Sequence, residues 1–434
     1  MDGALGDSFL IAPVVARKPP TAADLILRLL QATWRGYFVP VEALRLVWDE
    51  SFTEYDFGPA HPMSPVRLDL TARLCRDLGL FSHAGIHVVD ADPASDEILT
   101  TVHTPEYVAA VKEAGAAAWG TPNELMGLGT DDVPIFEGMH EASARVASGS
   151  RDVALAVWNR EALHGVNFTG GLHHAKPAQA SGFCVYNDIA VGIQALLDAG
   201  AKRVAYVDVD VHHGDGVEVI FWDEPRVMTI SLHETGQVLF PGTGFAHEIG
   251  GSKAMGESVN LAFPAGVGDA AWLRGFHAVV PALLRAYRPE ILVTQHGCDS
   301  HALDPLAHMA LSLDAQRASY EALHDLSHEL CDGRWVALGG GGYELVDVVP
   351  RAWAHLVGIA GHHPVEPSTR LPQTWRDYVM EAFGRQPPAR MTDGRTGDYK
   401  PWHLGHDTGD AADRAIMATR KAVFPLHGLD PWFD

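Results

Sequence analysis

Short apolar segments alternate with helix-like segments through the middle of the chain, and this alternation restricts the fold more than any other sequence feature. Strands that alternate with helices are typical of βαβ units and a mostly parallel sheet. We therefore expect one α/β domain of three layers, with a mostly parallel central sheet flanked by helices. The expected strands are residues 43–48, 153–157, 204–211, 227–232, 291–294 and 335–338. The expected helices are residues 67–78, 137–147, 187–199, 269–287 and 314–329.

The pattern changes at both ends of the chain. Residues 1–42 are predicted to be an N-terminal extension, and residues 43–363 the main domain. Eight prolines are scattered between Pro364 and Pro431, with polar and Gly-rich stretches between them. Because proline and glycine interrupt regular structure, we expect residues 364–434 to be an extension with few regular elements that packs on the main domain.

The composition excludes several classes of function. The chain has 55 acidic and 32 basic residues and a net charge of −23. Such an excess of negative charge argues against nucleic-acid binding and against an anionic membrane surface, but leaves a cationic partner open. No apolar run is long enough to span a bilayer. The four cysteines form no C-x-x-C pair and no disulfide framework, which indicates a cytoplasmic protein whose metal site, if it has one, uses His and carboxylate ligands.

The densest group of chemically active residues follows the apolar segment at residue 204. Side chains of a strand alternate between its two faces, so Asp208, Asp210 and, if the strand continues, His212 share one face. Burying two carboxylates and an imidazole is costly unless they are paired or bind a metal. The Gly-Asp-Gly turn at 214–216 suggests a cleft at the carboxyl end of this strand. The alternative is a hydrogen-bonded core network or an ordinary turn.

Two adjacent histidines, His173 and His174, follow a Gly-Gly turn. Neighbouring side chains diverge on a strand but can point the same way from a turn. A histidine that acts as a base needs a carboxylate on its other ring nitrogen, and Asp208 and Asp215 are available. Alone, the pair is weak evidence of function.

Asp299 lies just beyond another apolar segment and is a candidate for a third metal ligand. Together with Asp210 and His212 it would hold one divalent ion and leave a position for water, as catalytic zinc sites do. The alternative for Asp299 alone is a strand-end cap.

Four glycines, residues 339–342, precede Tyr343. They lack the spacing of a dinucleotide-binding loop and the Lys-Ser/Thr of a P-loop. We interpret them as a flexible segment that brings Tyr343 into the site, where its hydroxyl can donate to an oxygen on which charge develops.

Together these segments resemble the zinc-dependent histone deacetylase family, which has the arginase/deacetylase fold. The matching segments are 61–67 (HPMSPVR), 170–176 (GGLHHAK), 181–188 (SGFCVYND), 208–216 (DVDVHHGDG), 240–244 (FPGTG) and 339–343 (GGGGY). They occur in order within residues 44–360. Residues 127–130 and 138–141 resemble the bacterial acetoin-utilisation branch in particular.

The resemblance implies a role for each matching residue. Zinc is bound by Asp210, His212 and Asp299. His173 and His174 line the attacking water, with Asp208 and Asp215 as their orienting carboxylates. His174 is the general base and then the acid, and Tyr343 polarises the acetyl carbonyl. The substrate tunnel and its rim comprise Asp132, Gly182, Phe183, Phe240 and Leu306, and Arg67 lies in the cavity through which acetate leaves.

The resemblance also implies cofactors and a substrate. The same ligands suit Fe²⁺ as well as Zn²⁺. A structural K⁺ ion is expected at Asp208, Asp210, His212, Ser231 and Leu232, whereas Glu257 and Ser258 depart from the pattern of a second monovalent site. The implied reaction is hydrolysis of acetyl-lysine in a protein, with an acyl-CoA synthetase as one candidate substrate.

Three alternatives remain at this point. An arginase-like enzyme with two manganese ions needs further carboxylates, but no Asp-x-Asp pair follows Asp299. An acetylpolyamine amidohydrolase would share every site motif. A non-catalytic scaffold would be expected to have lost a ligand, the base or the tyrosine, and all are present.

Overall fold

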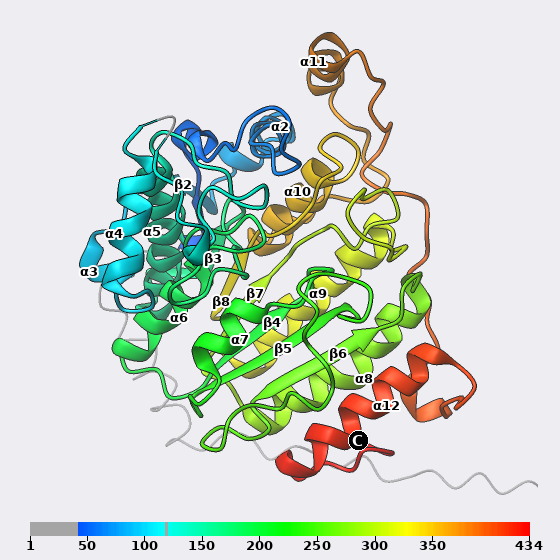
Figure 1. Cartoon of the computed structure of the whole chain (residues 1–434). Coiled ribbons are helices and arrows are strands. Elements are labelled where there is room, and N and C mark those ends of the chain that lie inside the picture. The colour runs from blue at the N-terminus through cyan, green and yellow to red at the C-terminus, as the bar shows by residue number, and fades with distance from the viewer. Residues whose placement is uncertain (1–41, 118–119) are drawn as a thin grey trace, which may run out of the picture. The chain divides into compact units, whose positions relative to one another are not determined.

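The structure is a computed structural model that describes residues 42–117 and 120–434. Apart from Glu42, the predicted N-terminal extension lies outside the described residues. The central sheet has eight strands, all paired in parallel, in the order β2-β1-β3-β8-β7-β4-β5-β6 (Figure 1). The strands are β1 (Glu42–Val47), β2 (Ile86–Val89), β3 (Ala162–Asn167), β4 (Val204–Asp208), β5 (Val227–Glu234), β6 (Ser258–Phe263), β7 (Ile291–Gln295) and β8 (Trp335–Leu338).

Helices cover the sheet and complete a three-layer α/β fold, as the sequence predicts. The helices are α2 (Val66–Asp77), α3 (Asp96–Leu99), α4 (Pro105–Gly115), α5 (Met139–Trp158), α6 (Asp188–Asp198), α7 (Asp215–Phe221), α8 (Asp269–Tyr287), α9 (Leu313–Leu330), α10 (Val349–Ala360), α11 (Gln373–Phe383) and α12 (Ala411–Val423). Helix α5 packs against α4, α6 and β3, whereas α10 packs against α2, α9 and β3. None of the described helices is long and apolar enough to cross a membrane.

The strand predicted at 153–157 is wrong, because these residues are the last turns of α5. The preceding helix is predicted at residues 137–147, but α5 continues beyond them through Gly149, a glycine that serves close packing. A Cβ atom there would lie 2.9 Å from Cγ1 of Val47 and 3.0 Å from Nδ2 of Asn167. The helix therefore continues through Gly149 while β1 and β3 pass close beneath it.

The expectation of few regular elements after residue 363 is also wrong. Helices α11 and α12 lie there, and the eight prolines fall outside both. Asp410 caps the N-terminus of α12, and its side chain accepts a hydrogen bond from the backbone N–H of Asp413. It packs on β6 and α8 (Figure 1). The buried Arg274 of α8 forms an ion pair with Asp413, 2.6 Å apart.

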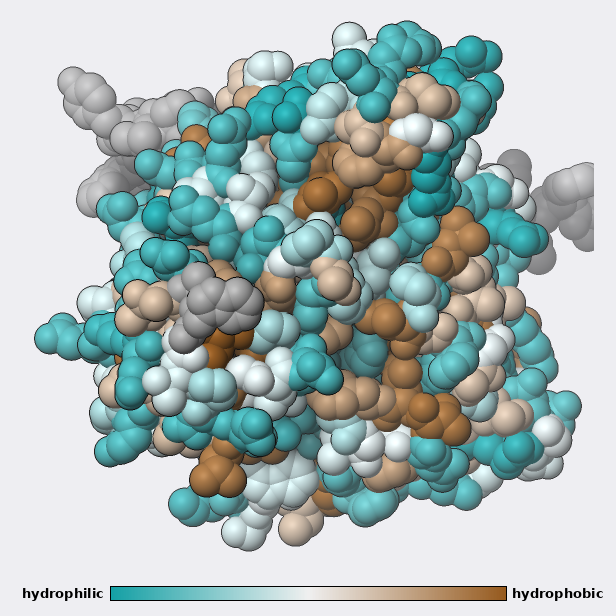
Figure 2. Space-filling view, turned by 45° about the horizontal axis from the view of Figure 1, so that its top comes forward, coloured by the Kyte–Doolittle hydropathy of each residue, from teal (hydrophilic) through white to brown (hydrophobic). Residues whose placement is uncertain are grey.

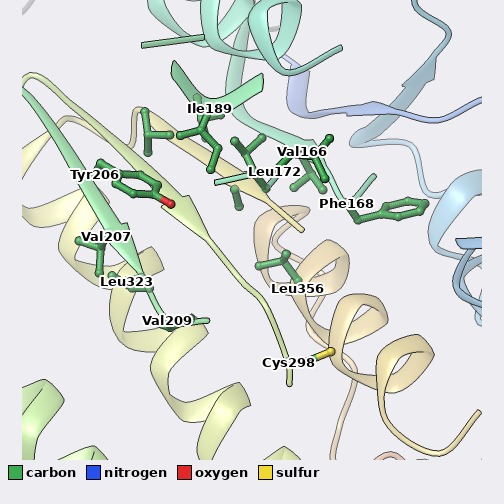
Figure 3. Close-up of a cluster of buried hydrophobic side chains, with 14 of the residues drawn as sticks. Val166, Phe168, Leu172, Ile189, Tyr206, Val207, Val209, Cys298, Leu323 and Leu356 are labelled. Carbon is green, nitrogen blue, oxygen red and sulfur yellow. The ribbon is translucent and has the colours of Figure 1, made fainter. Parts of the chain in front are cut away.

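The core lies between the sheet and its two helix layers. Figure 3 shows how β3, β4, α6, α9 and α10 contribute side chains to one apolar cluster. Its labelled members are Val166, Phe168, Leu172, Ile189, Tyr206, Val207, Val209, Cys298, Leu323 and Leu356, all buried. The cluster continues past the carboxyl ends of β3, β4 and β7, so it supports the loops that leave these strands. On the outer surface, Figure 2 shows apolar side chains gathered in places on a largely hydrophilic face.

Candidate active site

The candidate site is built from loops that leave adjacent strands at the same edge of the sheet. Strand β4 pairs with β7 on one side and with β5 on the other, so Asp208 is level with Gln295 and Ser231. The glycine segment after β8 and the histidine pair after β3 reach the same place, because these strands are the next neighbours of β7. This is the carboxyl edge at which parallel α/β sheets bind ligands.

Three predicted metal ligands come together at this edge. Nδ1 of His212 lies 3.1 Å from Oδ1 of Asp210 and 3.1 Å from Oδ2 of Asp299, and all three residues are buried. β4 ends at Asp208, so the strand predicted over residues 204–211 is too long, and Asp210 does not share a strand face with Asp208 as predicted. The strand also does not continue to His212. Both follow on a loop, whose backbone N–H at Val211 donates to Oδ1 of Asp299 at 2.9 Å.

The electrostatics of this trio fit a bound cation. Burial and the neighbouring Asp210 carboxylate raise the pKa of Asp299 to about 7. Two carboxylates this close repel each other unless a positive charge separates them. Carboxylate oxygen and imidazole nitrogen are both ligands that zinc accepts. Among residues 42–117 and 120–434, Asp210, His212 and Asp299 are the group at this edge whose ligand atoms lie close enough together to hold a metal. A single group of this kind fits one ion rather than two.

The two adjacent histidines each have their own carboxylate. Nδ1 of His173 lies 2.7 Å from Oδ2 of Asp208, and Nδ1 of His174 lies 2.7 Å from Oδ1 of Asp215. The Nε2 atoms of the two rings are 3.0 Å apart. Each carboxylate fixes the ring orientation and leaves Nε2 facing the site.

The two rings differ in their affinity for protons. Burial alone would lower the pKa of His173, but the Asp208 and Asp210 carboxylates outweigh it and raise the pKa to about 9. Burial and repulsion from His173 lower the pKa of His174 to about 3 in spite of Asp215. His174 is thus the ring that is neutral at pH 7 and has a lone pair available for a proton.

The glycine segment folds tightly around the ligand carboxylates. A Cβ atom on Gly341 would lie 2.0 Å from Oδ2 of Asp299, so only glycine fits there. The backbone N–H of Gly341 donates to Oδ2 of Asp210 at 2.8 Å. The backbone N–H of Tyr343 donates to Oδ2 of Asp304 at 2.8 Å, and this hydrogen bond fixes the backbone position of the tyrosine.

A cavity of about 280 Å³ leads to these groups. Its lining includes every residue predicted for the tunnel and rim, namely Asp132, Gly182, Phe183, Phe240 and Leu306, together with His174, His212, Leu239 and Tyr343. The ring of Phe240 packs edge-on against His174, with centroids 4.9 Å apart. Asp132 accepts a hydrogen bond of 2.7 Å from the backbone N–H of Gly182, and burial raises the pKa of its carboxyl.

A smaller inner cavity lies behind the histidine pair and includes Arg67 and Met63 in its lining. Nη1 of Arg67 donates to the carbonyl oxygens of Gly340 at 2.7 Å and Gly342 at 3.3 Å. The guanidinium also lies 5.2 Å from the ring centroid of Trp353. Arg67 is therefore a buried cation beside the glycine segment.

The residues predicted for a monovalent ion lie on neighbouring segments. Ser231 and Leu232 belong to β5, and Ser231 is level with Asp208 of β4. Oγ of Ser231 lies 2.8 Å from Nδ1 of His233. Asp210 and His212 follow on the loop from β4. Glu257 and Ser258, which depart from the pattern of a second monovalent site, lie at the start of β6.

The sequence reasoning missed several supporting residues. Nε2 of Gln295 donates to Oδ2 of Asp210 at 2.7 Å, and the hydroxyl of Tyr206 donates to Oδ2 of Asp208 at 2.6 Å. Asp188 accepts from the backbone N–H groups of Gly171 and Leu172, which shapes the turn before the histidines. Gln295 and Tyr206 had a usable signal, because both are polar residues in otherwise apolar strands. Asp188 ends the matching segment 181–188, a signal to which no role was assigned. Asp304 had none without the fold.

Known proteins share this fold and these segments. A family model of the histone deacetylase domain matches residues 61–360. The acetoin utilization protein AcuC of Bacillus subtilis (strain 168) is 39% identical over 346 residues, covering 76% of this chain and 89% of that protein. AcuC of Staphylococcus xylosus is 34% identical over 332 residues, covering 76% and 85%. A solved structure of an HDAC homolog complexed with SAHA aligns with a TM-score of 0.75 and 25% identity, over 87% of this chain and 99% of that one.

The fold and the matched domain define a deacetylase, a class of hydrolase. The chain belongs to the histone deacetylase family, and within that family it is similar to the AcuC proteins. Members of this family generally depend on a metal, and the Asp210, His212 and Asp299 group is a candidate place for one.

Proposed function

We propose that this protein hydrolyses the acetyl amide of acetyl-lysine in proteins, releasing acetate and free lysine. One observation carries the proposal: two His–Asp pairs and an Asp/His/Asp trio meet at the end of an apolar-walled cavity that also reaches Tyr343. The cavity suits an uncharged acyl group on an aliphatic stem, and the polar groups lie where its amide would reach.

Asp210, His212 and Asp299 would hold the metal ion, for which we propose zinc, with Fe²⁺ as an ion that the same ligands accept. When bound, a zinc ion supplies a lowered pKa for water and polarisation of the carbonyl oxygen. The protein contributes the rigidity of the site. Gln295 and the backbone of Gly341 bind Asp210, and the backbone of Val211 binds Asp299.

His174 is proposed as the group that moves the proton. Its Nδ1 faces Asp215, so Nε2 faces the site and accepts a proton from water as the water oxygen bonds to the acetyl carbon. The same nitrogen then gives the proton to the lysine nitrogen as the carbon–nitrogen bond breaks. The Tyr343 hydroxyl donates a hydrogen bond to the acetyl oxygen while negative charge develops on it. His173, held by Asp208, orients the water beside them.

The remaining predicted residues are proposed to recognise substrate and product. Phe183, Phe240 and Leu306 enclose the lysine stem, and Asp132 at the rim accepts a hydrogen bond from the substrate backbone. Arg67 provides a positive charge for acetate in the inner cavity. A K⁺ ion bound by Asp208, Asp210, His212, Ser231 and Leu232 would brace the loop after β4.

We propose an acyl-CoA synthetase as a candidate substrate protein. We also propose that the enzyme itself is located in the cytoplasm. The thiols support a reducing compartment, because all four cysteines are free and buried. The acetylpolyamine and scaffold alternatives remain competitors in the experiment below.

The test is hydrolysis of a fluorogenic acetyl-lysine peptide by protein of measured metal content, with and without a hydroxamate chelator. Turnover that the hydroxamate inhibits, with about one catalytic metal ion per chain, is the expected result. Turnover of acetylspermidine without peptide turnover would identify a polyamine amidohydrolase. Inertness towards both, with the metal in place, would contradict an enzymatic role.

Asp132 and the adjacent Asp131 offer a matched pair of substitutions to test whether the substrate is a peptide. Asp132 lines the cavity, whereas Asp131 is exposed. Loss of a charged hydrogen bond of about 1.5–3 kcal/mol predicts that Asp132→Asn raises the KM for a peptide roughly tenfold to a hundredfold. Asp131→Asn should leave it unchanged. An equal effect of both substitutions, or an effect of Asp132→Asn confined to kcat, would contradict peptide binding at the rim.

A further inference from the structure

Four histidines gather at a second place, away from the candidate active site. They are His164, His324, His328 and His362, and one ligand atom from each lies within 4.8 Å of all the others. His164 is in the first half of β3 and is level with Trp335, the first residue of β8. The cluster therefore lies towards the amino ends of these strands, opposite the edge that carries His173 and His174.

The distances within the cluster are those of a metal site. Nε2 of His328 lies 3.2 Å from Nε2 of His164 and 3.2 Å from Nε2 of His362, and the latter two are 3.3 Å apart. Nitrogens bound to one tetrahedral zinc at 2.0–2.1 Å are separated by about 3.3–3.4 Å. The three nitrogens thus already form one face of such a tetrahedron.

Hydrogen bonding cannot account for this arrangement. Each Nε2 atom is either protonated or carries a lone pair. With three atoms in mutual contact, at least two must be of the same kind, and such a pair repels at 3.2–3.3 Å. Nε2 of His324 is buried and has no hydrogen-bond partner among residues 42–117 and 120–434. A cation that accepts a lone pair from each ring removes both the repulsion between the Nε2 atoms and the lack of a partner for His324.

We propose that His164, His324, His328 and His362 bind a second zinc ion, distinct from the catalytic metal. Imidazole is a ligand that zinc favours, and four protein ligands with no open position are typical of structural zinc sites. The ion joins β3, α9 and the turn after α10. The proposal is independent of the reaction proposed above.

The local structure presents the four rings to one point. His324 and His328 are four residues apart on α9 and so share a face of that helix. His362 has a φ of 53°, a left-handed backbone conformation that few residues other than glycine adopt. This conformation directs the chain back towards the helix. His164 is fully buried, with its ring against that of Trp335 at a centroid distance of 5.6 Å.

The charges around the rings favour their neutral, metal-binding form. Burial, followed by repulsion from the other three imidazoles, lowers the pKa of His164 to about 2. Burial and its histidine neighbours lower the pKa of His324 to about 4. Oδ1 of Asp325 lies 3.5 Å from Nδ1 of His324, in the place where a carboxylate supports a ligand histidine. His328 and His362 are exposed, so an ion can enter from solvent.

The test is a zinc count on the full-length protein, equilibrated with Zn²⁺ and dialysed against metal-free buffer. We expect about two ions per chain in the unaltered protein and about one in His324→Gln/His328→Gln. Asp210→Ala should also bind about one, through loss of the other ion. The double variant should retain its turnover of acetyl-lysine peptide, which also shows that it is folded.

His363→Gln is the matched control, because His363 is an exposed neighbour of His362 that stacks on His83 outside the cluster. It should still bind two ions. Single replacement of the exposed His328 by Gln provides a variant with little risk to folding, and it should weaken zinc retention in the same direction. One zinc in the unaltered protein, or two in the His324→Gln/His328→Gln variant, would overturn the proposal.

Discussion

Histidines gather at both ends of strand β3, but only those at its carboxyl end have buried carboxylates beside them. There, His173 and His174 each contact an aspartate at 2.7 Å. At the other end, His164, His328 and His362 contact one another, and the nearest carboxylate, that of Asp325, is largely exposed. The same side chain is thus oriented for proton transfer in one place and suited only to share a cation in the other. Partners, rather than the residue type, decide its chemistry.

The largest expected effect concerns the trio that distinguishes the active-site end. Asp210→Ala removes one of two carboxylates and the acceptor for Gln295 and Gly341. We expect turnover of acetyl-lysine peptide to fall to background, with loss of one metal ion per chain. Metal analysis and a turnover assay on the same sample check this. Activity that survives with the metal lost would contradict the ligand assignment.

The next effect tests the histidine pair itself. His174→Ala removes the proposed base but none of the metal ligands. We expect kcat to fall about 10²- to 10⁴-fold, the usual contribution of a positioned acid–base group. Single-turnover assays at fixed metal content measure it, and His328→Gln at the other end of β3 is the control that should leave kcat unchanged. A loss of less than about tenfold would assign the proton transfer elsewhere.

A smaller effect is expected when Tyr343 loses only its hydroxyl. Tyr343→Phe keeps the ring in the cavity and removes one donor to the developing oxyanion. Loss of such a donor costs about 3 kcal/mol, or roughly 10²- to 10³-fold in kcat. The metal content should not change. Near-full activity of this variant would show that the hydroxyl takes no part.

The last prediction concerns stability instead of turnover, and a third way of burying histidine. His103 lies close to two backbone groups: Nδ1 is 3.0 Å from the carbonyl of Lys176, and Nε2 accepts from the N–H of Asn187 at 3.0 Å. Burial lowers its pKa to about 4. The pKa of His103 is lower in the folded protein than in the unfolded chain. The contribution of neutral His103 to the free energy of unfolding is therefore complete above pH 6.5, and it is lost as the pH falls from 6.5 to about 4.

The loss amounts to up to about 3 kcal/mol of unfolding free energy at full protonation. Urea unfolding at a series of pH values measures it. His103→Gln should be less stable at pH 7 and should have a flatter dependence between pH 6.5 and 4. The same slope in both proteins would assign the pH dependence to other groups.

The sequence was sufficient where local pattern and tertiary environment agree. The helix at Asp269–Tyr287 and the strand at Trp335–Leu338 have the predicted limits. It was insufficient where packing decides. The helix predicted at residues 137–147 continues to Trp158, and Gly149 lies within it, closely packed against Val47. The amphipathic pattern of α12 was hidden by the prolines on both sides.

The candidate site followed the same rule. Asp208, Asp210 and His212 are close in sequence and lie together in the structure. Asp299 and Tyr343 are distant in sequence, and their positions after an apolar segment and a glycine run made them candidates for the same site. The tunnel and rim residues had no such local signal, and only the family resemblance assigned them to it. The histidine cluster escaped notice although its His324-x₃-His328 spacing lay on a predicted helix, because β3 and the turn at His362 supply the rest.

The histidine cluster joins parts of the chain that are up to 198 residues apart. Links that close long loops restrict the unfolded chain most in theory, and secreted proteins use disulfides for this purpose. All four thiols of this protein are free. A zinc ion shared by β3, α9 and the end of α10 would thus be a reversible cross-link, and the resistance of this half of the sheet to unfolding would rise and fall with the zinc supply of the cell.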